Sequence, residues 1–211
     1  SLIRHLVLVR VVILITFLRG NPTFNPKEFF AKYRAALILC LCVGLNSLGQ
    51  GSTAPSMPIL AAQFGVGITM VGIAVIMVPV GRLTMSLPGG ILTQYFGRKP
   101  LLAGGIATIG IGSLCAFFSN SLLSLIGFRL LSGLGMGIFT VIATVYLRDI
   151  STEQNRARYQ SLNPLSILVG SSLGALLGGL IASTTSLRVP FLIQTITSGT
   201  TILIIYLFLP E

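Results

Sequence analysis

The chain has 211 residues, of which 53% are hydrophobic and only 9% are charged, and its mean hydropathy is +0.93. A water-soluble domain cannot cover so much apolar surface with polar side chains, so the composition predicts a protein that lies in a lipid bilayer. The formal net charge is +10, but the basic residues stand singly between long apolar runs. This pattern excludes the clustered basic surface that a nucleic-acid-binding protein needs.

The histidine content excludes most catalytic sites. His5 is the only histidine and lies among arginines near the N-terminus, so the apolar segments cannot assemble a Ser/His or Cys/His dyad or a multi-histidine metal site. We therefore expect neither an enzyme nor a bound metal or cofactor.

Six stretches reach the roughly 20 mostly apolar residues that a membrane-spanning helix needs. They are continuously apolar and rich in Gly, which excludes the alternating pattern of β-barrel strands. We predict an all-α membrane protein with spans at about 35–59, 68–95, 101–118, 122–146, 162–182 and 190–209. A basic N-terminal extension, 1–33, is predicted to be interfacial or disordered and to precede the six-span unit 34–211.

The connections between the spans predict an orientation, because Lys and Arg are retained on the cytoplasmic side. Basic residues occur before the first span, between the second and third, and between the fourth and fifth. The other three links carry only Arg188. Both termini are therefore expected in the cytoplasm.

Two arginines lie inside predicted spans, Arg82 in the second and Arg129 in the fourth. A charge at mid-bilayer costs on the order of 3 kcal/mol, so such residues usually face a protein interior or a water-filled path. We interpret both as lining a polar path; the alternative is that they snorkel or cap backbone carbonyls. The polar residues Asn46, Gln50 and Thr53 of the first span suit a wall of the same path, although local hydrogen bonding between helices would also explain them.

Glycine spacing predicts tight helix packing. The fourth and fifth spans carry glycines at four-residue intervals, which places each set on one helix face and lets another backbone approach closely. These residues are Gly133 and Gly137 in the fourth span, and Gly170, Gly174 and Gly178 in the fifth.

The link between the second and third spans carries a specific motif. Its sequence, GGILTQYFGRK, resembles the G-x-L-x-D-x-x-G-R-K signature of the major facilitator superfamily, with Gly90, Leu92, Gly97, Arg98 and Lys99 in register. Three further segments resemble the motifs of that family in the same order: FRLLSGLGMG, YLRDISTEQNRAR and GSSLGALLGG.

The resemblance covers about Arg34 to Glu211 and implies the N-terminal half of a transporter. Members have two six-helix halves around a substrate cavity and work by rocking one half against the other. The implied partners are a small-molecule substrate, the lipid bilayer and a C-terminal six-helix half, so we expect the chain to be a fragment.

The resemblance also implies a gating region. Gln94 stands at the acidic position of the loop motif, where it replaces a charge–dipole contact by a neutral hydrogen bond. Asp149 is placed near the loop arginine, so Asp149 with Arg98 or Arg156 is predicted to form a charge latch. The alternative is a screened surface pair worth less than about 1 kcal/mol.

The fifth-span glycines resemble the motif typical of the antiporter branch, so the leading hypothesis is a proton-coupled exporter of the multidrug type that works by alternating access. A sugar or organic-anion carrier of the same superfamily stays open, because Ala175 stands where the antiporter branch has Pro. A non-transporting membrane scaffold also stays open, because Gln94 is not acidic. An intramembrane Ser/His protease is disfavoured by the absence of histidine from the spans.

Overall fold

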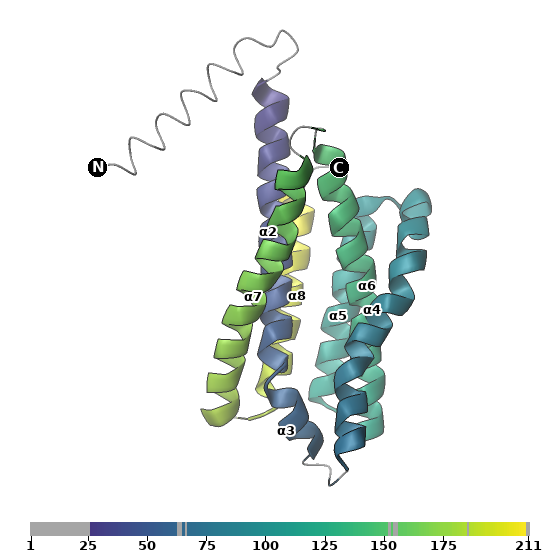
Figure 1. Ribbon diagram of the computed structural model, residues 1–211, viewed down its shortest axis with the longest axis vertical. Coiled ribbons are helices and arrows are strands. Elements are labelled where there is room, and N and C mark those ends of the chain that lie inside the picture. Colours follow the sequence, from purple (N-terminus) through teal and green to yellow (C-terminus); the bar gives the residue numbers. More distant parts are fainter. Residues whose placement is uncertain are drawn as a thin grey trace, which may run out of the picture. The chain divides into compact units, whose positions relative to one another are not determined.

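The regular structure of the chain follows its apolar runs. A computed structural model describes residues 26–62, 65, 67–151, 153, 156–184 and 186–209, and its regular structure in these ranges is α-helical. The helices, shown in Figure 1, are α2 (Pro26–Thr53), α3 (Ser56–Ala62), α4 (Ile68–Phe96), α5 (Arg98–Phe117), α6 (Leu122–Ile150), α7 (Arg156–Thr184) and α8 (Val189–Phe208).

The chain divides into two units, Ser1–Arg34 and Ala35–Glu211. Most of the predicted N-terminal extension lies outside the described residues. Its last part, 26–33, is helical, because α2 begins at Pro26. Helix α2 from Ala35 onward and the helices α3 to α8 belong to the second unit.

Six helices of the described residues are long and apolar enough to cross a membrane, which confirms the predicted all-α, six-span architecture. The candidate spans are Arg34–Thr53, Thr69–Thr93, Arg98–Phe117, Leu122–Ile150, Tyr159–Ile181 and Val189–Phe208. The largest difference from expectation is in the first span, which ends at Thr53. Ala54 and Pro55 form a turn there, and the separate helix α3 follows, because proline cannot donate the backbone hydrogen bond that a helix interior needs.

Glycines bring α2 and α7 into backbone contact. A Cβ atom on Gly170, Gly174 or Gly178 of α7 would collide with the backbone of α2, at the carbonyl oxygens of Gly44, Leu48 and Ser52 in turn. The four-residue interval is the same on both helices, so one face of α7 lies along one face of α2. Lipid tails offer no hydrophobic drive for association, and such close backbone approach supplies the packing contacts instead.

Glycines also bring α4 and α6 into backbone contact. A Cβ atom on Gly133 or Gly137 of α6 would collide with the backbone of α4 at Val78 or Arg82. Helix α6 also packs against α5, and α5 packs against α8. Figure 1 shows α6 alongside α4 and α5, and α2 alongside α7 and α8.

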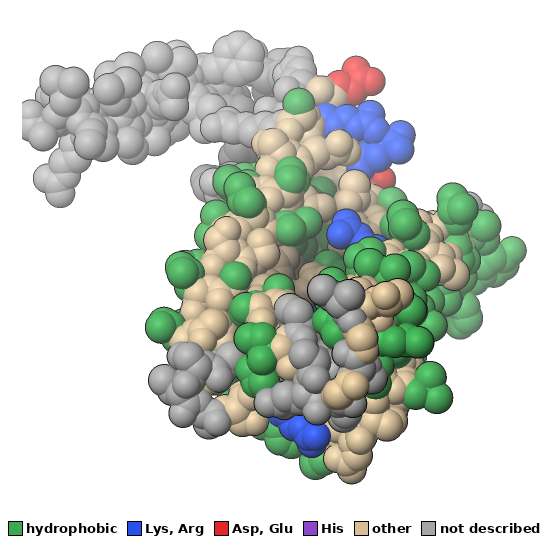
Figure 2. Space-filling model, turned by 60° about the horizontal axis from the view of Figure 1, so that its bottom comes forward, with side chains coloured by type: hydrophobic (Ala, Val, Ile, Leu, Met, Phe, Trp, Pro, Cys, Tyr) green, Lys and Arg blue, Asp and Glu red, His purple; other side chains and the backbone are tan. Residues whose placement is uncertain are grey.

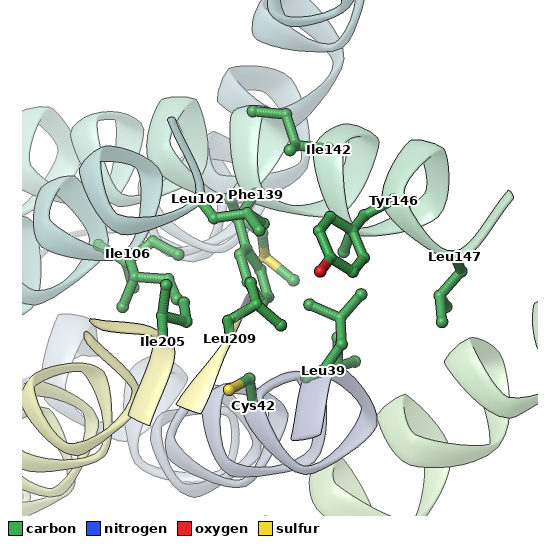
Figure 3. Close-up of a cluster of buried hydrophobic side chains, with 14 of the residues drawn as sticks. Leu39, Cys42, Leu102, Ile106, Phe139, Ile142, Tyr146, Leu147, Ile205 and Leu209 are labelled. Atoms are coloured by element: carbon green, nitrogen blue, oxygen red, sulfur yellow. The ribbon is translucent and has the colours of Figure 1, made fainter. Parts of the chain in front are cut away.

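Two clusters of buried apolar side chains lie inside the unit. The larger one, which we call the first cluster, draws on α2, α5, α6 and the end of α8, with Leu39, Leu102, Ile142 and Ile205 fully buried (Figure 3). The second cluster comprises Met57, Leu60, Ala74, Ala116, Leu125 and Phe191. Many other large apolar side chains are exposed on the flanks of the helices (Figure 2), as expected of surfaces that face lipid.

Candidate functional site

Among the described residues, Arg129 is the one charged residue whose side chain is buried. It lies on α6 about two turns after Leu122 and is 9% exposed. Its Nη1 donates a hydrogen bond to Thr53 Oγ1 of α2 at 3.2 Å, and its Cζ lies 5.8 Å from the ring centre of Phe191 on α8. The hydroxyl and the aromatic face both favour the charged guanidinium, so three helices hold this side chain in one place.

No acidic side chain of the described residues pairs with Arg129. The sequence contains four acids: Glu28, Asp149, Glu153 and Glu211. Asp149 lies on the same helix, but a separation of 20 residues corresponds to about 30 Å along its axis, and its carboxylate pairs with Arg98. A buried charge without a counter-charge is costly. A negative or strongly polar group from outside the described residues would lower this cost.

A small polar pocket adjoins Arg129. Its free volume is about 10 Å³, which is the room that one water molecule needs. Residues of five helices line it: Asn46, Gln50, Val78, Ile109, Ser113, Arg129, Ser132, Met136 and Gln194. The predicted path residues Asn46, Gln50 and Arg129 therefore meet at one pocket, and Thr53 adjoins it through its bond to Arg129.

Gln194 is a pocket residue that the sequence reasoning missed. It lies on α8, is 3% exposed, and donates from Nε2 to Asn46 Oδ1 at 3.3 Å. Ser113 and Ser132 were missed as well. The signal that could have found Gln194 is its position as the single carboxamide within the apolar run of α8.

Arg82 occupies a different place from Arg129. Its side chain is exposed on α4 and does not line the pocket, while its backbone carbonyl faces Gly137 of α6. The structure therefore separates the two arginines that the sequence placed on one path.

The loop motif forms a tight joint between α4 and α5. A single residue, Gly97, separates the two helices, and its φ of 77° lies in the left-handed region that glycine adopts without strain. Lys99 Nζ, at the start of α5, lies 6.0 Å from the ring centre of Tyr206 on α8. A Cβ atom on Gly90 would meet nothing within 4 Å, and the side chain of Gln94 lies outside the described residues.

Arg98 forms an ion pair with Asp149 at the end of α6. The two side chains are 44% and 35% exposed, so solvent screens the pair and its direct contribution to stability is small. Arg156, the other basic residue considered for this contact, begins α7 and makes no ion pair among the described residues. The acid predicted for the latch therefore meets the loop arginine.

Comparisons with known proteins agree with these features. The family model of the Major Facilitator Superfamily matches residues 39–211. The chain is 29% identical over 141 residues to "Sugar transporter ERD6-like 16" of Arabidopsis thaliana, covering 67% of this chain and 28% of that protein. It is 29% identical over 152 residues to "4-hydroxybenzoate transporter PcaK" of Pseudomonas putida, covering 72% and 33%.

A solved structure has the same arrangement of helices. The crystal structure of a D-xylose-proton symporter matches with a TM-score of 0.70 at 17% identity, over 87% of this chain and 49% of that one. The chain thus spans about a third or less of these curated relatives and about half of the symporter. The relatives named here are transporters rather than enzymes. With its six spans and a family match over most of its length, the chain is an integral multi-pass membrane protein that belongs to the Major Facilitator Superfamily.

Proposed function

We propose that the complete protein moves a small organic solute across a membrane by alternating access, with the solute held beside Arg129. The observation that carries the proposal is the buried guanidinium, which pairs with no carboxylate of the described residues. Burying an unpaired guanidinium costs free energy, and a ligand that supplies the missing partner reduces that cost. The six helices provide one wall of the solute path, and a second six-helix half provides the other.

The chemistry around Arg129 favours an anionic or hydroxylated solute. Gln50 and the hydroxyl of Thr53 add uncharged polar groups to the positive charge, and none of the pocket residues among the described part of the chain is an acid that would attract a cation. The names of two relatives, a sugar transporter and a 4-hydroxybenzoate transporter, denote solutes of these chemical classes. We therefore place a sugar or organic-anion carrier first.

A proton-coupled exporter of the multidrug type is the second candidate. The glycine face of α7, packed on the backbone of α2 through Gly170, Gly174 and Gly178, supports it, because this motif is the one that resembles the antiporter branch. Proton coupling would then depend on a carboxylate contributed by the second half.

We also propose the orientation of the unit in its membrane. Arg98, Lys99, Arg148 and Arg156 lie in or beside the links from α4 to α5 and from α6 to α7, whereas Arg188 precedes α8 in the link from α7. Positive residues are retained in the cytoplasm, so the end with the Arg98–Asp149 pair is proposed to be cytoplasmic, together with both termini.

Transport by the purified full-length protein in liposomes tests the proposal. The probes are 4-hydroxybenzoate, D-xylose and the lipophilic cation ethidium. We expect uptake of the carboxylate or the sugar, and we expect Arg129→Ala to abolish it while Arg129→Lys retains a part. Arg148→Ala removes a positive charge from the exposed end of the same helix and serves as the matched control.

The outcomes separate the alternatives. Transport of ethidium alone, driven by a proton gradient, would favour the multidrug exporter over the anion carrier. If Arg129→Ala transports like the parent, Arg129 does not lie on the solute path. A correctly inserted protein that transports none of the probes would favour the scaffold.

A further inference from the structure

The pocket beside Arg129 lies between the two apolar clusters. Along α5 the first cluster holds Ile106 and Ile109, the pocket holds Ile109 and Ser113, and the second cluster holds Ala116. The same succession runs in the opposite direction along α6, from Leu125 through Arg129 and Ser132 to Phe139. The polar atoms of the pocket are therefore enclosed by apolar side chains on both sides along the helix axes.

Three of these polar atoms lack a hydrogen-bond partner in the described part of the chain. They are Asn46 Nδ2, Gln194 Oε1 and Arg129 Nε, and their side chains are 3%, 3% and 9% exposed. Reversing both carboxamides would not help, because one donor and one acceptor of the Asn46–Gln194 pair would still be left over. Leaving a buried donor or acceptor unpaired is unfavourable, and such groups usually bind an ordered water.

The position of Gln194 is fixed by backbone packing. A Cβ atom on Gly49 of α2 would lie 2.9 Å from Gln194 Oε1 and 3.0 Å from its Cα, so the glycine lets α8 approach α2 closely. This approach brings the two carboxamides into contact, and both residues line the pocket.

We propose that this pocket binds one resident water molecule inside the six-helix unit, with Gln194 as its anchor. The water accepts hydrogen bonds from Asn46 Nδ2 and Arg129 Nε and donates to Gln194 Oε1. Its second proton goes to the hydroxyl oxygen of Ser132, whose own proton is donated to the Phe128 carbonyl at 3.1 Å. One water thus satisfies all three unpaired atoms, and the volume of about 10 Å³ excludes an organic solute. This site is independent of the transported solute and would exist in a protein that transports nothing.

Two buried methionines allow a direct test by X-ray hydroxyl-radical footprinting of the full-length protein, read by mass spectrometry. Radicals formed from a bound water oxidise the side chains beside it. Met136 lines the pocket and is 8% exposed, whereas Met57 is 1% exposed and belongs to the second cluster. We expect Met136 to be oxidised several-fold faster than Met57.

A pair of α8 variants then tests the anchor. Gln194→Leu removes the carboxamide, and we expect the oxidation of Met136 to fall to the rate of Met57. Thr201→Val is the matched control, because Thr201 is fully buried on α8 but donates within its own helix to the Thr197 carbonyl at 2.7 Å. The control should leave Met136 as reactive as in the parent.

Two results would overturn the proposal. Equal, slow oxidation of Met136 and Met57 in the parent means that the pocket is dry. Oxidation of Met136 that Gln194→Leu does not slow means that bulk water reaches it without a binding site. If Gln194→Leu does not fold, the comparison within the parent still decides, together with the presence or absence of a density peak beside Asn46, Arg129 and Gln194 in a high-resolution map.

Discussion

At the scale of single residues, the hydroxyl of Thr53 is the hydrogen-bond partner that fixes the direction of Arg129. Hydrogen bonds to charged groups contribute about 1.5–3 kcal/mol. Thr53→Val keeps the side-chain shape and removes this bond. We therefore expect the KM of the full-length protein for its transported probe to rise roughly tenfold or more, since about 1.4 kcal/mol corresponds to a factor of ten.

Thr53→Ser restores the hydroxyl and is the control for this prediction. Its KM should stay near that of the parent. If Thr53→Val transports with the KM of the parent, the bond from Arg129 does not position the guanidinium for the solute.

The residue scale also shows what the sequence could and could not predict about the site. Arg129 was identified because a charge in an apolar run stands out, and Asn46 and Gln50 because several polar residues gather in one span. Gln194 is a single carboxamide in the apolar run of α8, which is a weaker signal than a charge, and Ser132 carries no such pattern. Their role depends on the rotation and depth of α8 and α6 relative to α2, which hydropathy does not encode.

At the scale of helices, the contact between α2 and α7 depends on glycines, which have a hydrogen atom where other residues have a side chain. Gly174→Ala would drive a methyl group into the Leu48 carbonyl and force the helices apart. Overpacking of this kind costs about 1–3 kcal/mol, so we expect a clear fall in the melting temperature of the purified protein in detergent.

Gly179→Ala is the matched control on the same helix, because a Cβ there would meet nothing within 4 Å. Alanine favours the helix over glycine by up to about 1 kcal/mol, so the melting temperature should hold or rise. Equal losses in both variants would contradict the close packing of α7 on α2.

The helices themselves were largely predictable, because a bilayer requires long continuous apolar runs. Their ends were less so. Helix α6 continues to Ile150 and α7 begins at Arg156, beyond the predicted ends at 146 and 162, because polar residues extend a helix past the hydrocarbon core. Hydropathy marks the apolar section of a helix, and local backbone hydrogen bonding sets where it stops.

At the scale of the whole molecule, we predict that the Arg98–Asp149 pair biases the two access states. The pair is half-exposed, so Asp149→Asn should leave the melting temperature nearly unchanged. It should still shift the populations, which single cysteines at either end of the full-length protein report through their labelling rates. Cys40, Cys42 and Cys115 are replaced beforehand.

Arg156→Gln is the control for this experiment, because Arg156 makes no ion pair among the described residues. It should label like the parent. If Asp149→Asn labels like the parent, the Arg98–Asp149 pair is a surface contact without a gating role.

In the proposed transport cycle the solute binds beside the guanidinium of Arg129. The measurement to make in the full-length protein is solute protection of a cysteine at Gln50, a half-buried residue that can be reached from outside the water pocket. We predict that the transported probe slows the labelling of Gln50→Cys in a saturable manner and leaves Asn120→Cys, in the exposed link before α6, unaffected. Labelling of Gln50→Cys that stays constant at saturating probe would contradict binding of the solute beside Arg129.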